Sequence, residues 1–250
     1  MPPRLPFDRV ATIYDATRGL APRVLSKIVG VLVEELQGQR VLEVGVGTGR
    51  YAVPLQKSGI ALVGVDISRK MIELGLAKGL RNVLFGDGAH LPFRDDSFAV
   101  ATTNHMLHLV PDWREVLVEL GRVTTDRYVS IVEDGDRWPI KKEYDQLVRD
   151  AGHVWKAPGL HERALFEELP PDVIMPVGPF HETMSADAIL AELDRRDYSS
   201  QWEVPEPLHR DVMRRLRDTW GGRELSRTYS MDVSFWRIPR LVAFAKHRRS

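Results

Sequence analysis

The sequence of 250 residues predicts an α/β fold: a doubly wound, mostly parallel sheet of seven strands, with helices on both faces and a C-terminal helical insertion or lid. Short apolar runs alternate with helical patterns as far as residue 133, which is typical of parallel strands joined by right-handed crossovers. An alternating run at 228–237 predicts a further strand with one apolar face. A glycine-rich junction at 45–49 follows the first strand, as it does where a backbone must approach a ligand closely.

The elements of the N-terminal half follow from apolar spacing and from residues that start or stop helices. Pro22 precedes and Gly38 follows a run with apolar residues at helical spacing, so 22–36 is predicted as a helix. Ser68 and Gly79 bound a later helix in the same way. The full predicted order is strand 40–45, helix 48–58, strand 60–65, helix 69–78, strand 82–86, strand 98–104, helix 112–123 and strand 128–133.

The C-terminal half is less regular. Its predicted elements are helices near 139–151, 161–168, 185–195 and 205–219 and extended segments at 173–183 and 228–237. We expect the last two segments to pair antiparallel at one sheet edge, and no second core is indicated. The chain is therefore predicted as a single domain, 1–250, with a core at 7–133 and acceptor-pocket or lid elements at 134–225 that interrupt the last strands.

Composition excludes several classes of function. The charges of the 35 basic and 35 acidic side chains cancel, which argues against a nucleic-acid partner. The segment 246–249 is locally basic, and we expect it to be a frayed terminus. Without cysteine, the chain has no disulfide, no thiolate nucleophile and no cysteine zinc site. No apolar run reaches the length of a membrane span, and the first residues lack the apolar region of a signal peptide. We expect a cytoplasmic protein without a membrane partner.

The junction after the first strand predicts a cofactor site. Gly45, Gly47 and Gly49 alternate between a buried strand and a helix, so main-chain amides can reach a ligand there. Two carboxylates, Glu43 in the first strand and Asp66 at the end of the second, lie along the same crevice and could bind ribose hydroxyls. Because 47–52 also fits the relaxed pattern G-x-G-x-x-A, this segment alone leaves a dinucleotide and S-adenosylmethionine as alternatives.

The segments at 86–93 and 95–98 distinguish between these ligands. Because it carries these two segments as well as the glycine loop, the chain resembles the class I S-adenosylmethionine-dependent methyltransferases, in particular the methyltransferase type 11 group. The resemblance covers residues 7–133 and includes four motifs. The resemblance implies a Rossmann-like fold, S-adenosyl-L-methionine as cofactor, and methylation of a small molecule by in-line displacement without a metal. It departs from the family at Ala99, where relatives often carry an aspartate, and in the turn at 122–127.

The resemblance also implies roles for individual residues. The glycine loop lies against the methionine part of the cofactor, and Asp66 accepts hydrogen bonds from the ribose. Ile67 and Met71 enclose the adenine, and Asp87 reads its amino edge together with the backbone that follows. Together with Glu43, which is predicted from its place in the crevice, the cofactor-binding set is Tyr14, Arg18, Glu43, Gly45, Gly47, Gly49, Asp66, Ile67, Met71, Asp87, Gly88, Ala89, Asn104 and His105.

The catalytic residues are not determined by the sequence. His105 and His108 follow the fourth predicted strand, and either could take a proton from the acceptor or could serve packing, backbone hydrogen bonding or cofactor contact. Tyr14 is a third candidate. No carboxylate or third histidine accompanies the two histidines at a diagnostic spacing, so no metal site is predicted. Asp134, Asp136 and Trp138 follow the fifth strand, where they could contact an acceptor or form an ordinary polar loop.

Three functions remain open from the sequence. The first is methyl transfer to a small molecule, with oxygen, nitrogen or carbon as the accepting atom. The second is a non-catalytic module that binds S-adenosylmethionine, and the third is a nicotinamide-dependent oxidoreductase. Residues 104–107, Asn-His-Met-Leu, lack the Asn/Asp-Pro-Pro-aromatic motif of enzymes that methylate base amines, which argues further against nucleic acid. The oligomeric state is not predicted.

Overall fold

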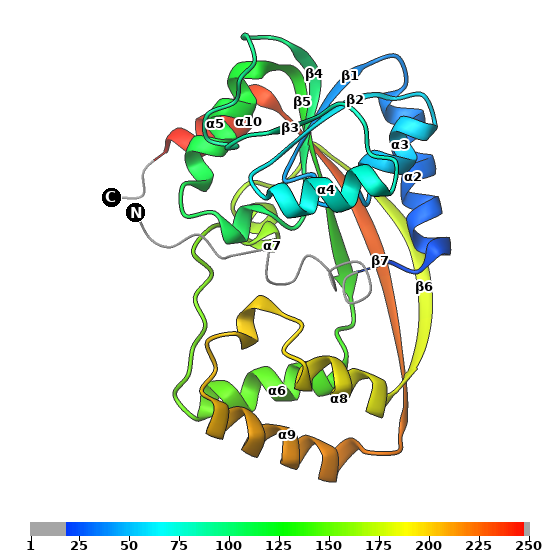
Figure 1. The fold of residues 1–250 in the computed structure, drawn as a ribbon, viewed down its shortest axis with the longest axis vertical. Coiled ribbons are helices and arrows are strands. Elements are labelled where there is room, and N and C mark those ends of the chain that lie inside the picture. Colours follow the sequence, from blue (N-terminus) through cyan, green and yellow to red (C-terminus); the bar gives the residue numbers. More distant parts are fainter. Residues whose placement is uncertain (1–18, 248–250) are drawn as a thin grey trace. The chain divides into compact units, whose positions relative to one another are not determined.

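Seven strands form one mixed sheet in the computed structural model, which describes residues 19–247. The strand order is β3-β2-β1-β4-β5-β7-β6 (Figure 1). The bounds are β1 Arg40–Val44, β2 Ala61–Asp66, β3 Val83–Phe85, β4 Phe98–Thr103, β5 Thr124–Gly135, β6 Val173–Ser185 and β7 Glu224–Arg237. The α/β fold class predicted from the sequence is confirmed.

The first five strands are parallel, and the last two pair with each other in opposite directions. Val44 of β1 is aligned both with Val65 of β2 and with Thr103 of β4, so these three strands end at the same edge. Between β6 and β7, His181 contacts Thr228 and Thr183 contacts Ser226, a register that runs antiparallel. The predicted antiparallel pairing at a sheet edge is therefore confirmed.

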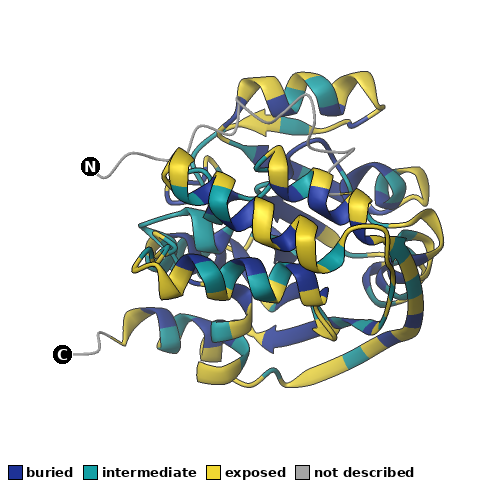
Figure 2. Ribbon diagram, turned by 90° about the horizontal axis from the view of Figure 1, so that it is seen from below, coloured by how far each residue is buried: buried dark blue, intermediate teal, exposed yellow. Residues whose placement is uncertain are grey.

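The helices that cover the strands are amphipathic. They are α2 Pro22–Leu36, α3 Ala52–Lys57, α4 Arg69–Ala77, the 3-10 turn η2 Leu107–Leu109, α5 Trp113–Val123, α7 Glu162–Glu168 and α10 Ile238–Lys246. In α2, the buried residues Val24, Ile28, Leu32 and Leu36 recur every fourth position. Figure 1 shows α2 and α3 on one side of the strands and α5 and α10 on the other, and the buried and exposed stripes of the helices are visible in Figure 2.

Two of these helices differ from the prediction. Helix α3 begins at Ala52 rather than at residue 48, because Gly49 has φ of +78° and cannot continue a right-handed helix. Helix α10 was not predicted at all. It packs on α5 so closely that a Cβ on Gly121 would lie 2.1 Å from Cγ2 of Val242, and the apolar positions 238, 241, 242 and 245 repeat at helical spacing.

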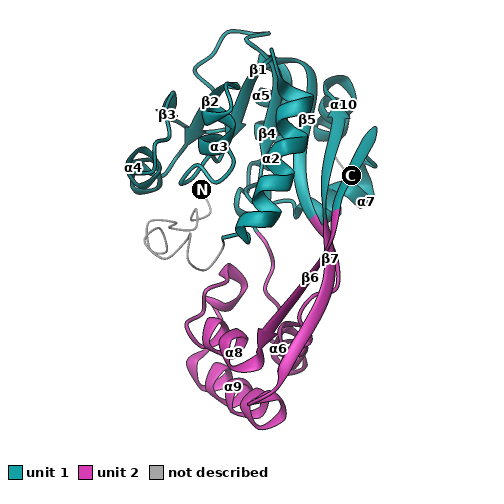
Figure 3. Ribbon diagram, turned by 90° about the vertical axis from the view of Figure 1, so that its right-hand side faces the viewer, with its two compact units in different colours: residues 1–132, 158–177, 231–250 teal, residues 133–157, 178–230 magenta. Residues whose placement is uncertain are grey.

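The chain divides into two compact units (Figure 3). Unit 1 comprises residues 1–132, 158–177 and 231–250, and unit 2 comprises 133–157 and 178–230. The segment 158–177 thus belongs to unit 1 rather than with the rest of 134–225. The reason is apolar packing within unit 1, where the Phe166 ring of α7 meets the buried Trp236 ring edge-on, with centroids 5.1 Å apart.

Unit 2 has its own helices and its own apolar core. The helices are α6 Pro139–Asp150, α8 Ala186–Asp194, the 3-10 turn η3 Ser199–Gln201 and α9 Glu206–Trp220. Their buried faces form a cluster that includes Ile140, Tyr144, Leu190 and Met213. The expectation that 134–225 holds no second core is therefore wrong. No helix among residues 19–247 has both the length and the apolar character needed to cross a membrane.

Candidate functional site

The glycine loop that follows β1 is a tight, left-handed segment. Gly45, Gly47 and Gly49 have φ of +75°, +55° and +78°, which residues with a Cβ rarely adopt. Both Gly45 N and Val46 N donate to the carbonyl of Val65, at 2.8 and 3.2 Å. A Cβ on Gly45 would lie 2.6 Å from Cγ of Met106, so the loop is also closed on that side. The three glycines are required by this backbone path.

Asp66 connects the end of β2 to the glycine loop. Its Oδ2 accepts a hydrogen bond from Gly47 N at 2.7 Å, and its Oδ1 accepts one from Ser68 N at 2.8 Å. The carboxylate is partly buried. An ionised carboxylate oxygen accepts hydrogen bonds, which is the chemistry that a ligand hydroxyl requires.

Glu43 is a buried carboxyl beside the same loop, with 2% of the residue exposed. Asn104 Nδ2 lies 3.4 Å from its Oε1, but its Oε2 has no hydrogen-bond partner among the residues that the structure describes. Burial raises the pKa of Glu43 to about 8, against the Asn104 hydrogen bond and the charge of Arg50, which lower it. A buried polar atom without a partner is rare and costly, which makes this oxygen a candidate contact for a bound cation.

Asn104 connects the three neighbouring strands β1, β4 and β5. Besides Glu43, its amide donates to Thr102 Oγ1 at 3.2 Å, and its Oδ1 accepts from Ile131 N of β5 at 3.3 Å. The next residue, His105, has φ of +55° and is half-buried. The positive φ turns the chain sharply, so that Met106 packs on the glycine loop.

The residues expected around the adenine lie at the ends of β2 and β3. Ile67 is 48% exposed, an unusual state for a large apolar side chain. Met71 is buried, and its Cε lies 3.6 Å from the position that a Cβ would occupy if Gly47 carried one. Asp87 Oδ1 accepts from Ala89 N at 3.1 Å, and Gly88 has no room for a Cβ, which would lie 2.7 Å from Val44 Cγ1. These contacts bring the predicted positions to the edge that carries the glycine loop.

His108 forms a pair that the sequence did not indicate. Its Nδ1 lies 3.1 Å from Oε2 and 3.3 Å from Oε1 of Glu162, and the two side chains are 13% and 5% exposed. Burial alone would raise the pKa of Glu162, but the hydrogen bond and charge of His108 outweigh burial and hold this pKa at about 2. The partners are 54 positions apart, in η2 and at the start of α7, so no local pattern could reveal them.

Some predicted residues are placed elsewhere. Tyr14 and Arg18 lie outside the described residues. Within 19–247, no group of three or more His, Cys, Asp or Glu side chains is arranged to hold a metal ion. Of the three candidates after β5, Trp138 is buried in unit 2, and Asp136 contributes its backbone carbonyl, 3.4 Å from an Arg227 nitrogen.

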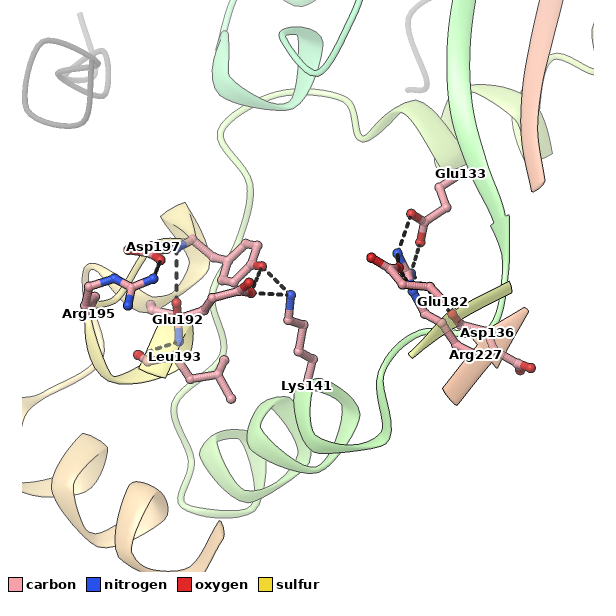
Figure 4. Close-up of polar contacts among 11 residues, drawn as sticks. Glu133, Asp136, Lys141, Glu182, Glu192, Leu193, Arg195, Asp197 and Arg227 are labelled. Atoms are coloured by element: carbon pink, nitrogen blue, oxygen red, sulfur yellow. Dashed lines mark hydrogen bonds and ion pairs between the residues drawn. The ribbon is translucent and has the colours of Figure 1, made fainter. Parts of the chain in front are cut away.

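Arg227 is the centre of a polar cluster inside unit 2 (Figure 4). It bonds Glu133 at 2.6 Å and Glu182 at 2.9 Å. Its guanidinium also lies 5.0 Å from the ring centroid of Trp138 and 4.2 Å from that of Tyr229. The side chain is 12% exposed, so this cation is held by two carboxylates and two rings.

Lys141 of α6 is a second paired cation of unit 2 (Figure 4). Its Nζ lies 2.9 Å from Oε2 of Glu192 and also donates to the hydroxyl of Tyr198, which in turn donates to Glu192 at 2.8 Å. Burial lowers the pKa of Lys141, while the charge of Glu192 raises it. Both clusters connect helices and strands of unit 2, which is the arrangement of charges that stabilise a fold.

The segment that known proteins match includes the glycine loop and the ends of β2, β3 and β4. A family model described as a methyltransferase domain matches residues 42–127. The demethylmenaquinone methyltransferase of Corynebacterium glutamicum is 35% identical over 122 residues, 47% of this chain and 53% of that enzyme. An uncharacterised protein of Methanocaldococcus jannaschii is 31% identical over 155 residues, 59% of this chain and 73% of that protein. The chain spans about half the length of the demethylmenaquinone methyltransferases that it matches.

Solved structures share the fold. A protein of Anabaena variabilis described as a methyltransferase from an antibiotic biosynthesis pathway has a TM-score of 0.58 at 17% identity, over 87% of this chain and 98% of that chain. The [4+2]-cyclase SpnF has a TM-score of 0.51 at 15% identity, over 91% and 93% of the two chains. Because a protein named for a cyclisation has the same fold, the fold alone does not determine the reaction.

Proposed function

Because the chain belongs to the type 11 group of class I methyltransferases, we propose that it transfers a methyl group from S-adenosylmethionine to a small-molecule acceptor. One observation carries the proposal. The buried Glu43 carboxyl stands beside the glycine loop with an oxygen that lacks a partner among the described residues. An amino acid ammonium group is a ligand of the charge that such an oxygen requires.

The other residues of this edge fit the remaining parts of the cofactor. The carboxylate of Asp66 lies against the glycine loop, where ribose hydroxyls would donate to it, and Asp87 stands at the end of β3 and accepts a hydrogen bond from Ala89 N. The exposed Ile67 offers an apolar surface for the adenine. When bound, S-adenosylmethionine supplies a methyl group with a good leaving group, so the chain needs chiefly to align the reactants and exclude water. Such alignment contributes about 7 to 11 kcal/mol in well-oriented systems.

The same geometry argues against a nicotinamide-dependent oxidoreductase. In dinucleotide sites, the glycine loop offers its main-chain N–H groups to a pyrophosphate. Here Gly47 N already donates to the carboxylate of Asp66, so this donor is occupied and a negative charge lies beside it. An anionic pyrophosphate at this loop would meet negative charge where it needs donors.

For the methyl acceptor, we propose only its class, a small molecule. Demethylmenaquinone methyltransferases match the cofactor half of the chain, so their name does not extend to the segments expected to shape an acceptor pocket. Net charge of zero favours a small molecule over nucleic acid. The expected cytoplasmic location likewise stays a prediction.

Calorimetric titration and a turnover assay test the proposal. S-adenosylhomocysteine should bind the full chain with 1:1 stoichiometry, and NADH should not bind. With S-adenosylmethionine, a panel of phenols, naphthoquinols and primary and secondary amines should release S-adenosylhomocysteine with at least one member. Binding without release across the panel would favour the non-catalytic module, and tight binding of NADH alone would overturn the assignment.

A further inference from the structure

We propose that Glu162 is a positioning residue that orients His108 as the proton acceptor for the methyl acceptor. This inference rests on the proposed function. It selects His108 from the three candidate bases, and it adds a residue of α7 that no local sequence pattern indicates.

The hydrogen bonding of the His108 ring is one-sided. Nδ1 faces both oxygens of Glu162, at 3.1 and 3.3 Å. An ionised carboxylate can only accept, so in the neutral imidazole Nδ1 carries the proton and Nε2 carries the lone pair. Within residues 19–247, Nε2 has no hydrogen-bond partner, and the side chain keeps 13% of its surface exposed. The ring is therefore fixed at one nitrogen and open at the one that can accept a proton.

The backbone around the pair is also held. Gly159 N donates to the carbonyl of His108 at 3.1 Å. A Cβ on Gly159 would lie 2.0 Å from the carbonyl oxygen of Leu107 and 2.4 Å from that of Val110, so the two segments touch directly. Because η2 and the segment before α7 are in backbone contact, the carboxylate of Glu162 and the imidazole of His108 have little freedom to separate.

The pair lies on the side of the sheet edge where the cofactor residues gather. Met106, two residues before His108, packs on Gly45, and Thr103 at the end of β4 is aligned with Val44. The segment that carries His108 thus leaves β4 directly over the glycine loop. The same segment begins at Asn104, whose side-chain amide lies 3.4 Å from Glu43.

The step balances with groups that the proposed reaction already contains. An acceptor X–H loses its proton to Nε2 of His108 while X forms a bond to the methyl carbon. The methyl–sulfur bond breaks, and its electron pair stays on sulfur, which becomes a neutral thioether. The imidazolium so formed is stabilised by the carboxylate of Glu162 and later releases its proton to water.

Nitrogen NMR of the histidine-labelled full chain, saturated with S-adenosylhomocysteine, tests the orientation without any acceptor. At a pH where the ring is neutral, Nδ1 should carry the proton and Nε2 should show the shift of an unprotonated nitrogen. In Glu162→Gln, the two tautomers should mix, because a carboxamide can donate as well as accept. A wild-type ring protonated at Nε2 would overturn the proposal.

Kinetics with the most active panel acceptor test the role in turnover. His108→Asn should lower kcat by about 100-fold or more and Glu162→Gln by about tenfold, with KM for S-adenosylmethionine within about twofold of wild type. Glu162→Asp should restore part of the loss and the wild-type form of the kcat pH profile. Glu167→Gln, an exposed position of the same helix, is the matched control.

The outcomes separate this inference from the proposed function. A Glu162→Gln variant with wild-type kcat, or one that loses affinity for S-adenosylhomocysteine in proportion to kcat, would show a purely structural ion pair and refute the positioning role. A panel without any active acceptor would count against the proposed function, whereas the tautomer of His108 decides the orientation by itself.

Discussion

Buried charge is arranged differently in the two units. In unit 2, Arg227 is bonded to Glu133 and Glu182, and Lys141 is bonded to Glu192 and Tyr198. In unit 1, Glu43 is more deeply buried than either cation, yet one of its oxygens has no partner among residues 19–247. Paired charges hold helices and strands together, whereas an unpaired buried carboxyl costs stability and is retained where a ligand supplies the partner. The comparison predicts opposite effects of mutations in the two units.

The largest effect on stability is expected at Arg227. Truncation in Arg227→Ala leaves two carboxylates without their cation, and the free energy of unfolding should fall by about 3 kcal/mol. Affinity for S-adenosylhomocysteine should stay within about twofold of wild type. Urea denaturation and calorimetry measure the two quantities. Arg210→Ala, which removes an exposed partner of Glu206, is the control and should change stability by less than about 0.5 kcal/mol.

The largest effect on binding is expected at Asp66. In Asp66→Ala, affinity for S-adenosylhomocysteine should fall by one to two orders of magnitude, about 1.5 to 3 kcal/mol, because hydrogen bonds to a charged group are lost. Gly47 N also loses its acceptor, which loosens the loop. Unchanged affinity in a calorimetric titration would remove Asp66 from the site. Asp126→Ala, an exposed aspartate of unit 1, provides the comparison.

Features formed by residues close together in the chain were predicted from the sequence, and features formed by residues far apart were not. The glycine loop, the strand that carries Glu43 and the cap at Ser68 were predicted correctly, because each is encoded within a few residues and is confirmed by the backbone of the structure. The charge pairs could not be predicted in this way. Arg227 and Glu133 are 94 positions apart, and His108 and Glu162 are 54 apart.

The missed elements have a related cause. Helix α10 has the apolar spacing of a helix but follows a long strand directly, with Pro239 in its first turn, and the basic residues after it suggested a frayed end. The three helices of unit 2 were each predicted, but the core that they form depends on contacts between α6, α8 and α9. Local periodicity does not encode such contacts.

An effect opposite in sign to that at Arg227 is expected at Glu43. Its pKa of about 8 in the folded chain exceeds the ordinary value of 4.5, so the folded state holds a proton that the unfolded state loses. Stability in the absence of cofactor should therefore decrease as pH rises from about 4.5 to about 8. Glu43→Gln should lose this dependence and unfold at a higher temperature than wild type at pH 8. Thermal unfolding at pH 5 and pH 8 measures it, and a variant less stable than wild type at pH 8 would contradict the account.

Proton release on cofactor binding tests the central claim most directly, namely that the buried carboxyl of Glu43 receives the ammonium group of S-adenosylmethionine. Because this carboxyl is largely protonated at pH 7, contact with a cation should expel its proton. Titration of S-adenosylhomocysteine into the full chain at pH 7, in buffers of different ionisation enthalpy, counts the protons. The account predicts release of about one proton by wild type and none by Glu43→Gln, and an equal number from both proteins would contradict it.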